Sequence, residues 1–114
     1  MNSAQDQFDF VDQFNWDDGL HPIASLVDSG TCAFEAALLA FWRCEGPWIY
    51  VGDIQTDPET RAFVDRLGAG ITSGTFLKGG LDYDPIAGEQ LTKVQVHQLE
   101  AKGLPTAFFG GAKP

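Results

Sequence analysis

Residues 32–46 read CAFEAALLAFWRCEG and form the most apolar run of the chain, composed largely of strong helix formers such as alanine and leucine. Large apolar side chains cover so much of the helical circumference that neighbours must pack on several sides; these are Phe34, Leu38, Leu39, Phe41 and Trp42. We expect the hydroxyl of Thr31 to cap the start of this helix, and Gly46 with Pro47 to end it. The stretch therefore predicts a central core helix, on which Glu35 and Arg43 mark the limited polar exposure.

Two shorter helices are predicted before this run. Residues 8–14 place phenylalanines and a valine between aspartates, a pattern typical of a short amphipathic helix, which Asn15 ends. A second helix is expected from Pro22 to about Asp28, because proline suits the first turn of a helix and Gly30 can stop it.

Two further helices are predicted after the central run. Asp57 followed by Pro58 is a strong helix start, since the carboxylate accepts amide protons and proline fits the first helical position. Thr92 and Gln95 have the spacing of a capping box, which places the start of the last helix there. Gly103 supplies the left-handed residue that ends it.

The remaining segments predict little regular structure. WIYVGD, residues 48–53, is rich in residues that favour extended chain, so we expect a short strand or an extended loop there. TFLKGGLDYDP, residues 75–85, reads as a turn with an extended passage. The fold class predicted is mainly α, a compact bundle of about five short helices with room for a small extended or two-strand supplement. We expect one domain over residues 1–114, with an ordered core at about 8–109 and a loose tail after Phe109.

Charge is unevenly distributed along the chain. The formal net charge is −9, and residues 1–60 hold eleven of the sixteen acidic residues with Arg43 as their only base. Such a field repels nucleic acid and anionic membrane surfaces and attracts basic proteins. No apolar stretch approaches the length that crosses a bilayer, and the amino terminus is acidic rather than basic and apolar. We therefore expect a cytoplasmic protein with a basic protein partner, no nucleic acid and no membrane.

The segment NWDDGLHP, residues 15–22, admits two interpretations. In the structural one, Trp16 packs on the core and Asp17 or Asp18 binds free amides at the start of the second helix. In the functional one, the two carboxylates beside an aromatic anchor clasp a lysine or arginine of a partner. The candidate partner-binding residues of the chain are Trp16, Asp17, Asp18, Asp28 and Glu35.

Metal ligation and a disulfide are not expected. Cys32 and Cys44 lie in one predicted helix, which separates them by roughly 18 Å, too far for a disulfide. His21 and His97 have no histidine or cysteine at ligand spacing, and the aspartates of residues 81–85 lack the glycine and the distant glutamate of a calcium loop. We predict no metal site, no cofactor and no catalytic residue.

Four motifs occurring in this order, NWDDG, AALLAFWR, LDYDP and LTKVQVHQLEAKGLP, resemble a bacterial family catalogued as a domain of unknown function, over roughly residues 8–107. The resemblance implies a small, mainly helical, cytoplasmic bacterial protein without an established activity or catalytic residue. In size and charge, members of that family are similar to the immunity proteins of bacterial toxin systems.

The leading functional hypothesis is a non-enzymatic acidic protein-binding module, in its most concrete form an immunity-type inhibitor of a bacterial toxin. One alternative is a small hydrolase or metal-dependent enzyme, with Asp17, Asp18 or His21 at a cleft between the first helices and the turn of residues 81–85. Another is a structural or regulatory adaptor that acts through exposed apolar surface.

Overall fold

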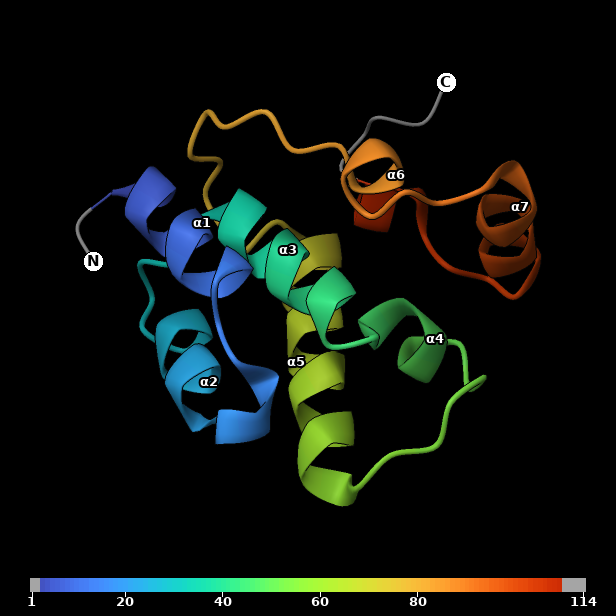
Figure 1. The fold of residues 1–114 in the computed structure, drawn as a ribbon, viewed down its shortest axis with the longest axis horizontal. Helices are drawn as coiled ribbons and strands as arrows, with labels where there is room; N and C mark the ends of the chain where they lie inside the picture. Colours follow the sequence, from blue (N-terminus) through green and yellow to red (C-terminus); the bar gives the residue numbers. More distant parts are fainter. Residues whose placement is uncertain (1–2, 110–114) are drawn as a thin grey trace.

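Helix α3 (Phe34–Arg43) is the centre of the fold, as predicted. A computed structural model describes residues 3–109, and within it every residue of α3 from Glu35 to Trp42 is buried. Helix α1 (Ala4–Asp12), helix α5 (Pro58–Ser73) and helix α4 (Gly46–Tyr50) pack against it. Figure 1 shows α3 running through the middle of the molecule, with α2 (His21–Val27) and α7 (Lys93–Ala101) at opposite sides.

The mainly α fold class is confirmed. Five of the helices in residues 3–109 have seven or more residues, and this part of the chain contains no strand. The remaining elements are the short helix α6 (Pro85–Gly88) and two 3-10 turns, η1 (Trp16–Asp18) and η2 (Thr106–Phe109). One isolated parallel bridge joins Ala33 to Leu77.

The core is a single cluster of aliphatic and aromatic side chains, to which α1, α2, α3, α4, α5, α7 and the C-terminal turn η2 all contribute. Phe108 of η2 stacks on Phe41 of α3 with ring centroids 4.4 Å apart, and the indole of Trp42 donates a hydrogen bond to the carbonyl oxygen of Phe108. The turn η2 is therefore part of the core. Its largest fully buried side chains are Phe41, Phe63, Phe108, Phe109, Ile23, Leu38, Leu39, Leu67, Leu99, Val11, Val64 and Pro47.

Both predicted helix starts in the C-terminal half are confirmed. The Asp57 side chain accepts from Thr60 N at the start of α5, and Thr92 with Gln95 forms a complete capping box at α7. At the end of α7, Gly103 adopts a φ of 96°, which a side chain would strain, and the amide of Leu104 donates back to Leu99 O.

The prediction for residues 48–53 is wrong, because the chain forms α4 over Gly46–Tyr50. Gly46 and Pro47 do not merely follow α3; they begin the next helix, with Pro47 in its first turn. Ile49 is buried, and Trp48 packs on Trp42 with ring centroids 5.8 Å apart. Packing of these side chains outweighs their preference for extended chain, which depends strongly on context.

The predicted cap of α3 is also wrong. The N-cap residue is Ala33, without a side-chain hydrogen bond, and the Thr31 hydroxyl lies against that of Ser29 at 3.1 Å. The amide of Phe34 instead donates to the carbonyl oxygen of Leu77 at 2.9 Å. A segment distant in sequence thus satisfies this helix start, which no local pattern could predict.

The first helix begins earlier than predicted. It starts at Ala4, where the Ser3 hydroxyl accepts from Asp6 N, and it ends at Asp12. The predicted loose tail falls on residues 110–114, outside the described part of the chain. Both cysteines are free thiols, as expected. None of the helices in residues 3–109 is long and apolar enough to cross a bilayer.

Candidate functional site

An open cleft of about 410 Å³ lies where η1 meets the end of α3 and the start of α5. We call it the Trp16 cleft, after the aromatic residue in its wall. It combines an indole with three carboxylates and one guanidinium, so its chemistry suits a cationic group. Its lining residues are Trp16, Gly19, Leu20, Arg43, Cys44, Glu45, Asp57, Glu59 and Thr60.

The position of Trp16 follows from a local turn. The side-chain oxygen of Asn15 accepts from the amide of Asp17 at 3.1 Å, and Gly19 closes the turn at a φ of 88° that disfavours any other residue. The Trp16 ring meets the ring of Phe14 edge to face, with centroids 5.2 Å apart. The half-buried indole is therefore held in one orientation in the cleft wall.

The acidic wall comes from two places. Glu45 sits between α3 and α4 in a left-handed conformation, with a φ of 63°. Asp57 caps α5, where hydrogen bonds from the amide and the hydroxyl of Thr60 lower the pKa of its carboxyl. Glu59 lies exposed in the first turn of the same helix. Because these carboxylates come from separate elements, only the fold brings them together.

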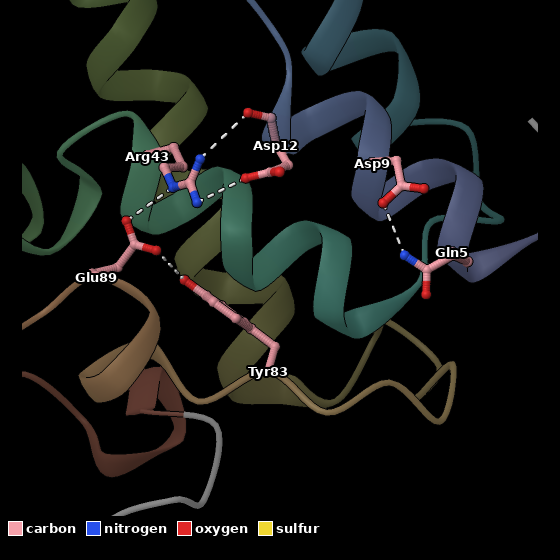
Figure 2. Close-up of polar contacts among 6 residues, drawn as sticks. All are labelled: Gln5, Asp9, Asp12, Arg43, Tyr83 and Glu89. Atoms are coloured by element: carbon pink, nitrogen blue, oxygen red, sulfur yellow. Dashed lines mark hydrogen bonds and ion pairs between the residues drawn. The ribbon is translucent and has the colours of Figure 1, made fainter.

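The charge of Arg43, the one basic residue that lines the cleft, is balanced by two carboxylates, those of Asp12 and Glu89 (Figure 2). Arg43 Nη2 lies 2.9 Å from an Asp12 carboxylate oxygen, and Arg43 Nε lies 2.9 Å from Glu89 Oε1. Burial by itself lowers the pKa of Arg43, but the two carboxylates outweigh it and raise the pKa. Since Asp12 and Glu89 lie outside the cleft lining and balance Arg43, the negative charge of Glu45, Asp57 and Glu59 remains uncompensated there.

The same network fixes the turn of residues 81–85. The Tyr83 hydroxyl donates to Glu89 Oε2 at 2.9 Å, and its ring meets Phe8 of α1 edge to face at 5.4 Å. Burial, followed by the negative charge of Glu89, raises the pKa of Tyr83. Tyr83 thus occupies the space between this turn and α1 where the enzyme hypothesis expected a cleft. A separate hydrogen bond, from Gln5 to Asp9, lies along α1 in the same view.

The two adjacent aspartates lie on η1, beside the Trp16 cleft but not in its lining. Asp17 and Asp18 are both exposed. The interpretation that one of them caps α2 is wrong, because the N-cap of that helix is Leu20 and no side chain binds its first amides. Their position is compatible with the functional interpretation, since both carboxylates are open to solvent on the same turn as Trp16.

The other two candidate residues lie elsewhere. Asp28 is exposed at the end of α2, with its carboxylate 3.5 Å from Arg66. Glu35 is only 6% exposed, and its Oε1 accepts from the amide of Gly79 at 2.7 Å. Glu35 therefore contributes an interior hydrogen bond, and the prediction that it marks an exposed polar position of α3 is wrong.

Residues 3–109 contain no group of three or more potential metal ligands from histidine, cysteine, aspartate and glutamate. Burial raises the pKa of both thiols, Cys32 and Cys44, to about 12, so neither is an available thiolate at neutral pH. Asp84 accepts from Ile86 N and caps α6 instead of serving a cation loop.

Sequence reasoning missed Glu45 and Glu59 as neighbours of Trp16. The only sequence feature that pointed to them was the excess of acidic residues in residues 1–60, and this excess does not show which of those residues lie together in space. No protein-family model matches the chain, and neither a curated protein nor a solved structure matches it. The resemblance to a domain-of-unknown-function family therefore stays a prediction.

Proposed function

We propose that this protein is a non-enzymatic binding module for a basic protein, most concretely an immunity-type inhibitor that covers the basic active cleft of a bacterial toxin in the cytoplasm. The observation that carries the proposal is the Trp16 cleft, in which an aromatic wall stands beside three carboxylates without a compensating base.

The cleft suits an arginine or lysine side chain of the partner. A guanidinium can lie on the indole face of Trp16 while it hydrogen bonds to the carboxylate of Glu45 or Glu59. Aromatic anchors that bind a partner residue in a hollow are typical of the energetic centres of interfaces. The indole is already oriented by Phe14, so little side-chain entropy is lost on binding.

The exposed aspartates beside the cleft have a different role. Asp17 and Asp18 lie in solvent, where ion pairs add little affinity but accelerate the encounter of oppositely charged surfaces. Under the proposal, Asp17→Asn with Asp18→Asn slows association and flattens its dependence on salt, while dissociation changes little. An association rate that is unchanged in the double variant would remove these residues from the interface.

The proposal is tested by affinity capture from the organism that encodes the chain, at low and at high salt, with the wild-type protein and three variants. Trp16→Ala removes the aromatic wall, and Glu45→Gln with Glu59→Gln removes cleft charge. Asp65→Asn with Asp82→Asn removes the same charge from exposed positions outside the cleft and serves as the matched control.

The proposal is supported if one basic protein is captured in stoichiometric amount and is released at high salt. The control variant should retain this protein, and both cleft variants should lose it. A partner that both cleft variants retain at wild-type levels would place the interface elsewhere. Recovery of no basic partner at low salt would contradict the proposed function.

A further inference from the structure

The segment between α5 and α6 carries an exposed leucine, Leu77, at an isolated bridge. Leu77 is 81% exposed, although it forms the parallel bridge to Ala33. Figure 1 shows this segment looping along the edge of the fold, above α3. An exposed leucine alone is ordinary, but here it coincides with an open backbone edge.

One edge of this segment is attached to α3 and the other is free. On the attached edge, Leu77 O accepts from Phe34 N at 2.9 Å and Gly79 N donates to Glu35 Oε1 at 2.7 Å. The peptide groups of Phe76 and Lys78 make no hydrogen bond with any residue in the described range 3–109. Leu77 forms the bridge by itself, and Phe76 lies at a bend just before it. Because peptide groups alternate in direction around a bridged residue, we place those of Phe76 and Lys78 on the free edge.

The hollow beside this segment has no carboxylate in its lining. An open hollow of about 550 Å³ adjoins Leu77, with Phe34, Ile71, Phe76 and Ala107 in its wall, and Lys78 is its only charged residue. The chain has a net charge of −9, concentrated in its first half. Two copies therefore repel each other through most approaches, whereas the lining of this hollow contains no acidic residue to oppose contact.

We propose that this edge pairs with the same edge of a second copy of the chain, antiparallel and about a two-fold axis. Phe76 of each copy then stands opposite Lys78 of the other as a hydrogen-bonded pair, so the free peptide groups satisfy each other. The two Leu77 side chains form the non-hydrogen-bonded pair between them, where cross-strand side chains lie closest. Each Lys78 faces a phenylalanine instead of its own counterpart, so no like charges oppose each other.

The dimer is expected to be weak and to depend on salt. Stable interfaces bury about 1,200–2,000 Å² of accessible surface, and pairing through three residues and one hollow buries less surface than that. Added salt screens the repulsion between the two acidic bodies, so dimerisation strengthens as salt rises. This direction is opposite to that expected for a basic partner at the Trp16 cleft, which keeps the two proposals distinguishable.

The first test is sedimentation equilibrium of the full chain at increasing concentration, in about 0.05 and 0.5 M NaCl. Leu77→Asp places two carboxylates opposite each other across the axis and is expected to raise the dissociation constant at least about tenfold. Val94→Asp is the matched control, because Val94 is the other exposed large hydrophobic residue in the described range and lies on α7. It should leave the dissociation constant unchanged.

The second test is amide hydrogen exchange of the wild-type protein over the same concentrations. The amides of Phe76 and Lys78 are expected to gain protection as the dimer forms, whereas protection of the Gly79 amide, already bonded within one copy, stays constant. A protein that remains monomeric at millimolar concentration in high salt would overturn the proposal. A dimer that Leu77→Asp leaves intact, or in which Phe76 and Lys78 gain no protection, would also overturn it.

Discussion

The indole Nε1 of Trp42 donates a 2.7 Å hydrogen bond to the carbonyl oxygen of Phe108, joining the central helix to the last turn of the described chain. Both residues are buried, and a carbonyl left without a partner in such a place costs free energy. This bond and the packing of Phe108 on Phe41 attach the C-terminal segment to the core.

Replacing Trp42 by phenylalanine should lower the free energy of unfolding by about 1–3 kcal/mol, because the carbonyl of Phe108 loses its donor. Urea denaturation measures the change. Trp48→Phe, at the half-buried indole that packs on Trp42, is the control and should cost less, since no hydrogen bond to a residue in the range 3–109 is lost. Equal losses in the two variants would assign the effect to packing rather than to the hydrogen bond.

Glu35 is expected to act on stability and not on partner binding. Glu35→Ala removes the acceptor of the Gly79 amide and should lower the free energy of unfolding by about 1–3 kcal/mol. Glu35→Gln keeps an oxygen at this position and should lose less. Affinity for a captured basic partner should be equal in folded Glu35→Gln and wild-type protein, and a large loss of affinity would return Glu35 to the interface.

Most of the helices could be predicted because their signals are local. Asp57 with Pro58, and Thr92 with Gln95, stand within three residues of the amides that they cap, so sequence spacing alone places these starts. The apolar run of α3 likewise identifies a buried helix by composition. The missed features depend on contacts between distant residues. Nothing near Phe34 indicates that Leu77 serves its amide, and Trp48 and Ile49 become helical through packing.

The candidate site was predictable only in part, for the same reason. Trp16 was recognised from its neighbouring aspartates, yet the carboxylates that share its cleft come from the α3–α4 junction and the start of α5. The sequence predicted Asp57 as the cap of α5, and the structure confirms it. That Asp57 also lines the Trp16 cleft follows from the packing of α5 and has no local signal. Exposure of Glu35 was mispredicted because the segment that covers it arrives 44 residues later.

Divalent metal ions should not stabilise the protein. A ligand that binds the native state raises the melting temperature in a concentration-dependent way, and residues 3–109 contain no cluster of three or more potential ligands. Thermal melts with about millimolar Mg²⁺, Ca²⁺, Mn²⁺ or Zn²⁺ should therefore match the melt in chelator. A rise that saturates with metal concentration would favour the metal-dependent enzyme over the binding module.

The two thiols should be unreactive in the folded protein. Burial raises the pKa of Cys32 and Cys44 to about 12, so almost no thiolate exists at pH 8. A colorimetric disulfide reagent should modify both cysteines in urea and neither under native conditions on the same timescale. Rapid native labelling of Cys44, which lines the Trp16 cleft, would show that the cleft opens more widely than this structure indicates.

Tyr83 should make the protein less stable in alkali. Burial and the nearby negative charge of Glu89 raise its pKa in the folded state above the ordinary value of 10, so the native protein retains a phenolic proton that the unfolded chain has released. The contribution of protonated Tyr83 to the free energy of unfolding is therefore fully present below pH 10, and it declines as the pH rises above 10. Urea denaturation between about pH 8 and pH 11 should show this decline in the wild-type protein. Tyr83→Phe has no ionisable proton, so it should be less stable at pH 8, where it lacks the bond to Glu89, but should lose less stability toward pH 11. Parallel curves for the two proteins would mean that Tyr83 ionises equally in both states and is not held by Glu89.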